Sequence, residues 1–253
     1  MRGPETVRMT VAYHGAGFSG FANNPGVRTV QQELEGALEK ILRIRVELTA
    51  AGRTDRGVHA QGQVVSWRST SDRLDVTRLA QSLNQLLAPE IAVSDVEVVD
   101  DDFDARFSAV GRTYHYRVLN RLVHDPLLEG MVWHVREPLD IDAMNVAARH
   151  LVGTHNFTSL CRRPKSNPDA ILVRRVASAQ WVQERPGLLR FEVSGKSFCH
   201  QQVRAMVGLL VSIGQRRRPP DAVVEVLAAR DRRSSPSTAP ARGLTLIEVS
   251  YSS

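Results

Sequence analysis

The chain has 253 residues, enough to bury one full core or two smaller ones. Lys and Arg number 33 against 27 Asp and Glu, and the net charge of +6 favours a polyanionic partner such as nucleic acid. Nearly all of this charge is arginine, which suits phosphate contact and base stacking, although a GC-rich genome would give the same bias. No apolar run is long enough to cross a bilayer and the first ten residues hold no apolar signal core, so we expect a soluble cytoplasmic protein without a membrane partner.

The two cysteines, Cys161 and Cys199, have neither CxxC nor metal-ligand spacing. We therefore expect neither a disulfide framework nor a zinc site, and a reduced cytosol fits best. The sequence also lacks a Gly-rich nucleotide loop, so it predicts no metal and no small-molecule cofactor.

The first half of the chain predicts strands and helices in the order βαββαβ. Thr29 begins a capping box before an apolar helical pattern, and Asp75 caps a second helix that stops before Pro89. This order is that of a ferredoxin-like fold. The expected elements are strands over 7–13, 46–51, 60–67 and 91–99, with helices from Val30 and over 76–87, and a long Gly- and Pro-containing loop over 14–28.

A run of three aspartates, 100–102, marks a plausible boundary, and we expect halves of 1–105 and 106–253. The second half repeats the βαββαβ skeleton with additions, although no sequence repeat is convincing. The sequence thus predicts an α+β protein of two ferredoxin-like halves, with antiparallel sheets side by side, helices on one face and a central cleft. Its expected elements are strands over 113–119, 131–135, 173–184, 188–193 and 244–251, with helices over 141–152, 200–214 and 222–229.

The segment 50–65 is the clearest candidate for chemistry. It places Asp55 at the tip of a tight loop between Arg53 and Arg56, with Gly52 and Gly57 allowing close backbone approach. An acid between two arginines should stay ionised, which suits an anionic nucleophile or an ion pair more than a general acid. The local pattern alone gives equal weight to a simple Asx-turn with solvated arginines.

The run Gly52-Arg53-Thr54-Asp55-x-Gly57-Val58-His59-Ala60-x-Gly62-Gln63-Val64 closely resembles the motif of the TruA family of tRNA pseudouridine synthases. Three further stretches extend the resemblance over essentially the whole chain. They are Asp102–Ala109 with Arg112–Tyr116, Phe198–Gly208, and Gly243–Tyr251.

The resemblance implies an isomerase that converts uridine into pseudouridine in the anticodon stem-loop of tRNA, at tRNA positions 38–40, and that works as a homodimer in an RNA-binding cleft. By the same resemblance Asp55 is the catalytic nucleophile, Arg204 pairs with it, and Tyr114 packs on the target base. Leu246 of the closing strand lines the pocket. We add Arg53 as the side chain that occupies the space left by the flipped uridine, and three weaker candidates for RNA contact: Arg162, Arg163 and Lys165.

Several alternatives remain open at this stage. Tyr114 and Tyr116 share one strand face, where tyrosines are more often core than base platforms. His14, Gly20-Phe21-Ala22 and Gln202 depart from the family pattern and bear on substrate positioning. A catalytically silent tRNA-binding protein of the same fold is one rival function. A nucleoside hydrolase is the other, which needs a second acid, for which Asp102 and Asp104 are the candidates.

Overall fold

A computed structural model describes residues 4–163, 167 and 170–252 of the chain. These residues form two compact units. The first contains the chain up to Val110 together with the segment from Thr245 onward, and the second is Gly111–Leu244. The last strand therefore lies with the first unit apart from Leu244.

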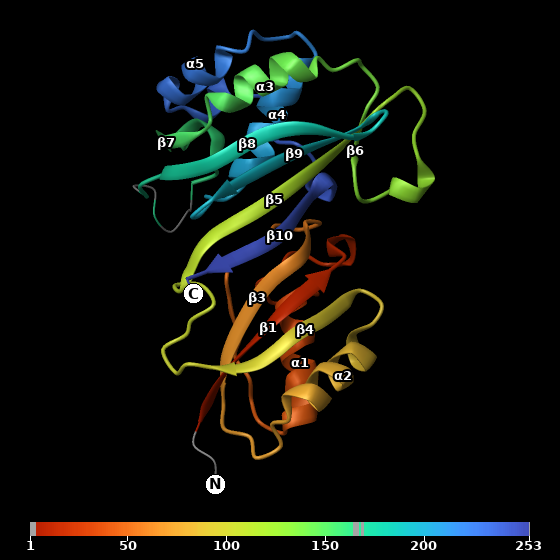
Figure 1. Cartoon of the computed structure of the whole chain (residues 1–253), viewed down its shortest axis with the longest axis vertical. Helices are drawn as coiled ribbons and strands as arrows, with labels where there is room; N and C mark the ends of the chain where they lie inside the picture. Colours follow the sequence, from red (N-terminus) through yellow and green to blue (C-terminus); the bar gives the residue numbers. More distant parts are fainter. Residues whose placement is uncertain (1–3, 164–166, 168–169, 253) are drawn as a thin grey trace. The chain divides into compact units, whose positions relative to one another are not determined.

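The first unit has the predicted ferredoxin-like arrangement (Figure 1). Its antiparallel sheet has the order β4-β1-β3-β2, and β10 adds to the start of β3 in parallel. The helices α1 and α2 pack against each other, and α2 packs on β4. The elements are β1 (Glu5–Tyr13), α1 (Val30–Leu42), β2 (Thr49–Ala50), β3 (His59–Ser69), α2 (Val76–Leu87), β4 (Ile91–Val99) and β10 (Leu244–Tyr251).

Local sequence explains how these elements begin. Thr29 accepts a hydrogen bond from the Gln32 amide and Asp75 accepts one from the Arg78 amide, so both predicted helix caps are confirmed. The strand expected over 46–51 is wrong in length. The amides of Val46 and Leu48 donate to the carboxylates of Glu39 and Glu35 on α1, so a helix and not a neighbouring strand satisfies them, and only β2 remains.

The second unit has the strand order β5-β9-β8-β7, with β6 parallel to β5 (Figure 1). Strand β7 was not predicted, because its four residues Gly-Thr-His-Asn carry no apolar alternation. Helix α4 begins at Gln202 and not at 200, because Gln201 is left-handed with φ 64°. The elements are β5 (Ala109–Asn120), β6 (Trp133–Val135), α3 (Ile141–Arg149), β7 (Gly153–Asn156), β8 (Val173–Arg185), β9 (Leu188–Gly195), α4 (Gln202–Gly214) and α5 (Ala222–Ala229).

The most deeply buried helix of the second unit is α4. Every residue of α4 is buried except Arg204, which is half-buried. The 3₁₀ helices are Gly15–Gly17, Pro126–Leu128, Thr158–Leu160, Arg232–Ser234 and Ala241–Gly243. In the described part of the chain, no helix combines the length and apolar character needed to cross a membrane.

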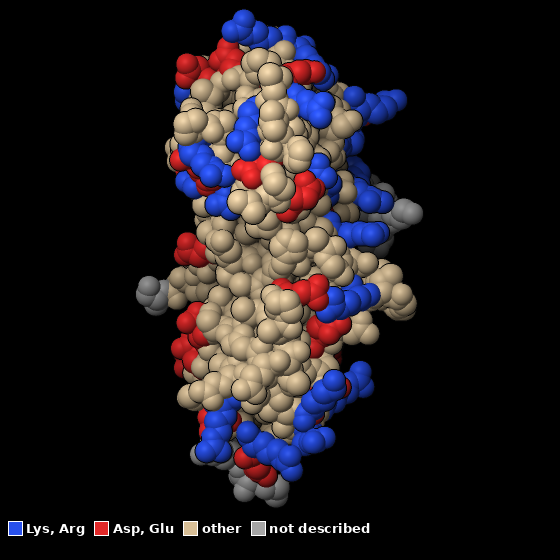
Figure 2. Space-filling model, turned by 90° about the vertical axis from the view of Figure 1, so that its right-hand side faces the viewer, with Lys and Arg blue, Asp and Glu red and all other residues tan. Residues whose placement is uncertain are grey.

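Acidic and basic side chains are interspersed on the surface, as Figure 2 shows for one face. Four such side chains form a network of salt bridges across β5, β8 and β9. The Glu184 carboxylate pairs with the guanidinium groups of Arg117, at 3.0 Å, and Arg190, at 2.5 Å. Arg190 also pairs with Glu192. Burial opposes ionisation of Glu184, but the hydrogen bonds from Arg117 and Arg190 outweigh it and hold the pKa of this carboxyl below its usual range.

We predict that Glu184→Gln lowers the free energy of unfolding by about 2 kcal/mol at pH 7, because two partly buried guanidinium groups lose their carboxylate. A carboxyl with a depressed folded-state pKa stabilises above its unfolded pKa and loses this contribution as pH falls through the folded pKa. The wild type should thus lose stability more steeply than the variant below about pH 4.5. Urea unfolding at several pH values measures this, with the exposed Glu137→Gln as control. Equal acid limbs for wild type and Glu184→Gln would refute the prediction.

Candidate functional site

The Asp55 loop connects β2 to β3 in the first unit. Asp55 is half-buried, whereas Arg53 and Arg56 on either side of it are exposed. The Val58 amide donates to the Asp55 carbonyl at 3.1 Å, and Gly57 adopts φ 78°, which favours glycine. The predicted tight loop with an acid at its tip is therefore present.

Hydrogen bonds from β1, from the loop after β1 and from β3 hold the first part of this loop. The Tyr13 hydroxyl at the end of β1 lies 2.7 Å from Oγ1 of Thr54, in a buried hydrogen bond. The Thr54 carbonyl accepts the Phe21 amide at 3.1 Å, and the Gly52 carbonyl accepts Nε2 of the fully buried Gln63 at 2.7 Å. The residues that precede Asp55 are thus fixed on both their backbone and side-chain sides.

Gly15 and His59 lock the other end of the loop. The Gly15 amide donates to Nδ1 of His59 at 3.0 Å, so the buried imidazole carries its proton on Nε2 and is neutral. A Cβ on Gly15 would overlap the Val58 carbonyl. His14 is exposed, and its ring centroid lies 4.6 Å from that of His59.

The two tyrosines of β5 differ in their surroundings. Tyr116 is fully buried, its hydroxyl donates to the Pro240 carbonyl at 2.8 Å, and burial raises its pKa. Tyr114 is only half-buried, and Phe198 meets its ring edge-on with centroids 5.4 Å apart. The core interpretation therefore holds for Tyr116, while Tyr114 keeps an accessible aromatic surface.

Arg204 exchanges two hydrogen bonds with Ala239, one through its side chain and one through its backbone. Its Nε donates to the Ala239 carbonyl at 2.9 Å, and the Ala239 amide donates to the Arg204 carbonyl at 3.0 Å. The segment 237–239 can approach α4 this closely because Gly208 has no side chain. A Cβ at Gly208 would overlap the Ser237 carbonyl. The hydrogen bond from Nε to the Ala239 carbonyl therefore helps to set the orientation of the guanidinium.

The remaining predicted site residues lie in different settings. Leu246 is buried on β10, in parallel register with Ala60 of β3 and hence in the same unit as the Asp55 loop. Arg53 lines a polar hollow of ≈ 330 Å³ that it shares with Arg45 and with Glu35, Glu39 and Glu47. Arg162 and Arg163 are exposed, and Lys165 lies outside the described residues.

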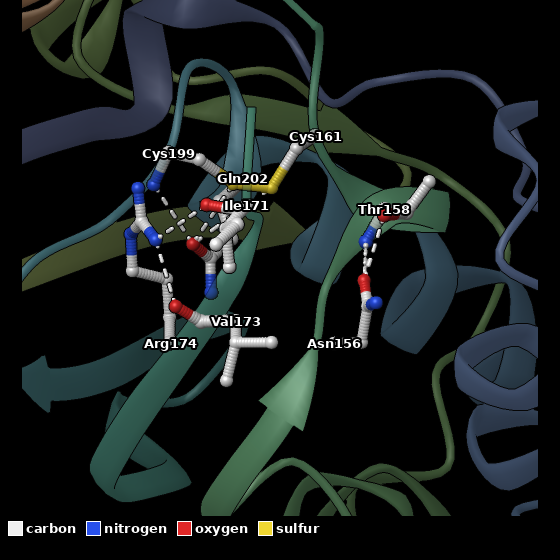
Figure 3. The surroundings of a disulfide bond; sticks show 8 residues. All are labelled: Asn156, Thr158, Cys161, Ile171, Val173, Arg174, Cys199 and Gln202. Atoms are coloured by element: carbon white, nitrogen blue, oxygen red, sulfur yellow. Dashed lines mark hydrogen bonds between the residues drawn. A yellow bond between two sulfur atoms is a disulfide. The ribbon is translucent and has the colours of Figure 1, made fainter. Parts of the chain in front are cut away.

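The expectation about the cysteines is wrong. Cys161 and Cys199 form a disulfide, with their Cα atoms 5.8 Å apart (Figure 3). The disulfide joins the residue after the Thr158–Leu160 3₁₀ helix to the segment before α4. The Arg162 amide donates to the His200 carbonyl between the same two segments. This contact joins residues 38 apart, which no local pattern predicts. The buried Gln202 accepts the Cys199 amide at 2.9 Å, so this departure from the family pattern supports the start of α4.

The two acids offered for a hydrolase, Asp102 and Asp104, lie in a turn where Asp102 is exposed and Asp104 has a structural role. The Asp104 carboxylate accepts the amides of Arg106 and Phe107, both at 2.8 Å, and so caps its own turn. Within the described ranges, no group of three or more His, Cys, Asp or Glu side chains could hold a metal ion.

Sequence reasoning did not identify the supports of the loop, and Gly15 offers a test of them. We predict that Gly15→Ala lowers the free energy of unfolding by at least about 2 kcal/mol, because the methyl group must displace the Val58 carbonyl. Gly36→Ala is the matched control. A Cβ at this position in α1 meets nothing within 4 Å and should stabilise by about 0.5–1 kcal/mol through helix propensity. Chemical denaturation measures both, and a neutral Gly15→Ala would contradict the packing described.

Comparison with known proteins bears on what this site does. A model of the family described as tRNA pseudouridine synthase matches residues 9–108 and 147–252. Three proteins named tRNA pseudouridine synthase A are similar along almost their whole length. The Moorella thermoacetica protein is 40% identical over 97% of this chain and 99% of its own, the Thermosipho africanus protein 40% over 95% and 97%, and the Myxococcus xanthus protein 39% over 97% and 91%. The chain therefore belongs to the tRNA pseudouridine synthase family, whose members are isomerases.

Proposed function

We propose that this chain converts uridine into pseudouridine in the anticodon stem-loop of tRNA, at positions 38–40, with Asp55 as the nucleophile. Family membership supports the reaction, and the resemblance of the four motifs supports the positions. The observation that carries the role of Asp55 is its place at the tip of a loop that is anchored on both sides. Tyr13 and Phe21 hold Thr54, Gln63 holds Gly52, and the Val58 amide bonds to the Asp55 carbonyl.

The reaction breaks the N1–C1′ bond of a uridine and joins the same base to C1′ through C5. C5 loses a proton and N1 gains one, so the product is an isomer of the substrate. An ionised carboxylate can begin it by attack on C1′ or C6, or by removal of the C2′ proton. All three routes require a charged Asp55. We propose that Arg204 supplies the opposite charge, as the family resemblance implies, because the Ala239 carbonyl orients its guanidinium through Nε.

The target uridine must first leave its stack, at a cost on the order of a few kcal/mol. Stacking on the accessible ring of Tyr114, worth about 1–3 kcal/mol, would offset much of this. We propose that exposed Arg53 occupies the vacated space in the tRNA and that Leu246 contributes apolar surface beside the base. Arg162, Arg163 and Lys165 are the weaker candidates for phosphate contact.

We predict that Asp55→Asn abolishes turnover while tRNA affinity stays within a few-fold, because the amide keeps the shape of the side chain and loses its charge. Tritium release from tRNA transcripts labelled with [5-³H]uridine measures the reaction, with the exposed Asp72→Asn as control. Release by wild type and Asp72→Asn alone supports the proposal. Binding without release by the wild type would favour the silent tRNA-binding protein, and free uracil would favour the hydrolase.

The tyrosine is tested by removing first its hydroxyl and then its ring. Tyr114→Phe should keep substantial activity, and Tyr114→Ala should lose roughly 5- to 100-fold in kcat/KM, as expected for a lost stacking partner. Since Tyr114 also packs on Phe198, circular dichroism should accompany the kinetics to exclude misfolding. Equal losses in both variants would mean that the hydroxyl matters and the ring does not.

We propose that the chain works in the cytoplasm as a homodimer, as the family resemblance implies. A loop between β5 and β6 supports a partner surface, because three of its apolar side chains are largely exposed: Leu122 (79%), Val123 (70%) and Leu127 (92%). Light scattering should give the mass of a dimer for the wild type and a smaller mass for Leu127→Glu. A monomeric wild type would contradict the proposal.

A further inference from the structure

The turn over Phe103–Ser108 presents an aromatic and a cationic side chain side by side. The Phe107 ring is 80% exposed, and the guanidinium carbon of Arg106 lies 5.4 Å from its centroid. Burial of a phenylalanine side chain is normally favourable, so an outward ring loses stability unless something covers it in the working state. A single exposed apolar residue is common, however, and the case rests on how the turn is built.

The turn is held rigidly on both sides. Asp104 accepts the amides of Arg106 and Phe107 through one carboxylate oxygen, and it exchanges hydrogen bonds with Ser108 at 2.9 and 3.1 Å. The backbone of the fully buried Ala105 is clamped to the sheet. Its amide donates to the Ser66 hydroxyl at 3.0 Å, and its carbonyl accepts the Tyr251 hydroxyl at 2.8 Å.

A second layer fixes this clamp. The Tyr251 ring packs on Phe103 with centroids 5.0 Å apart, and the Arg8 guanidinium lies within 6 Å of both ring centroids. The backbone of the turn is therefore fixed on the sheet by these hydrogen bonds. A fixed backbone presents the Phe107 side chain outward at a defined place, which lowers the entropy cost of binding a planar ligand there.

We propose that Phe107, with Arg106 beside it, is a stacking site for an unpaired nucleotide of the bound tRNA, outside the nucleotide that reacts. The proposal rests on the proposed function for the identity of the RNA. Every base has a π-face that can stack on phenylalanine, and the adjacent guanidinium adds attraction for the phosphate of the same nucleotide. The chain belongs to a family named for its action on tRNA, so a nucleic acid is the partner to which we assign this ring and the cation beside it. Ser108 leads directly into β5, so Phe107 and Tyr114 are seven residues apart in the chain.

The test compares substitutions of Phe107 in the full-length protein, with tRNA affinity and kcat measured separately. Phe107→Ala should weaken tRNA binding roughly 5- to 100-fold, the range expected for one lost stack, with kcat at saturating tRNA within twofold of wild type. Phe107→Leu should be as weak as Phe107→Ala, because it keeps apolar surface and loses the π-face. Phe107→Trp should restore affinity. Arg106→Ala should reduce the salt dependence of binding by about one phosphate contact, and Phe107→Ala should leave it unchanged.

A spectroscopic readout follows the ring itself. In Phe107→Trp the new indole should be quenched when tRNA is added. The wild type, whose Trp67 and Trp181 are buried and whose Trp133 is half-buried, is titrated in parallel and supplies the background. Wild-type affinity in Phe107→Ala, full rescue by Phe107→Leu, or an unquenched Trp would each overturn the proposal. A lower mass of Phe107→Ala in light scattering would assign the ring to a protein interface and overturn it as well. If the wild type binds tRNA without releasing tritium, the proposed function fails while the stacking result can still be read from binding.

Discussion

The structure of the first unit depends on how the polar groups just before Asp55 are satisfied. The loop exposes the charged side chains of Arg53 and Arg56, but Thr54 and Val58 on either side of Asp55 are buried. The Gly52 and Thr54 carbonyls therefore need partners from inside the unit, and they receive Nε2 of Gln63 and the Phe21 amide. The long loop after β1, which carries Phe21, is thus part of the scaffold of the loop that bears the acid.

The second unit applies the same constraint to a cation. Helix α4 is buried along its length, and a buried helix can carry an arginine only if that side chain has fixed acceptors. Ala239 supplies one through its carbonyl, and the absence of a side chain at Gly208 lets the 237–239 segment come close enough. Gly243 likewise allows the Tyr116 ring to pack against the backbone, because a Cβ at Gly243 would overlap that ring. The Tyr116 hydroxyl donates to the Pro240 carbonyl. Close approach at two glycines thus fixes both the core tyrosine and the orientation of Arg204.

Sequence predicted those features that are set by local periodicity and capping. The bounds of α2, β4, α5 and β10 follow from apolar spacing and from signals such as Asp75, and they agree with the structure. Features set by contacts between distant segments were not predictable. Glu35 and Glu39 replace strand partners for the residues before β2, and Cys161 meets Cys199 across 38 residues. The proposed site divides in the same way. Motifs pointed to Asp55, Tyr114 and Arg204, and Gln63 lies in the same motif as Asp55 without a pattern that gives its role, while Tyr13 and Gly15 carry no signal beyond their place in a strand and a turn.

The distribution of charge limits what the net charge of +6 can contribute to RNA recognition. Many arginines are neutralised locally, as Arg117 and Arg190 are by Glu184 and Glu192, and Arg28 by Glu33 and Glu90. Paired charges produce weak fields beyond a Debye length of about 8 Å at physiological salt. Long-range attraction of a polyanion by this chain is therefore set by the net charge of +6 and not by the full count of 33 Lys and Arg. Recognition must then depend on short-range contacts at fixed positions, which is the role that a rigid loop at Asp55, a held guanidinium at Arg204 and accessible rings at Tyr114 and Phe107 can serve.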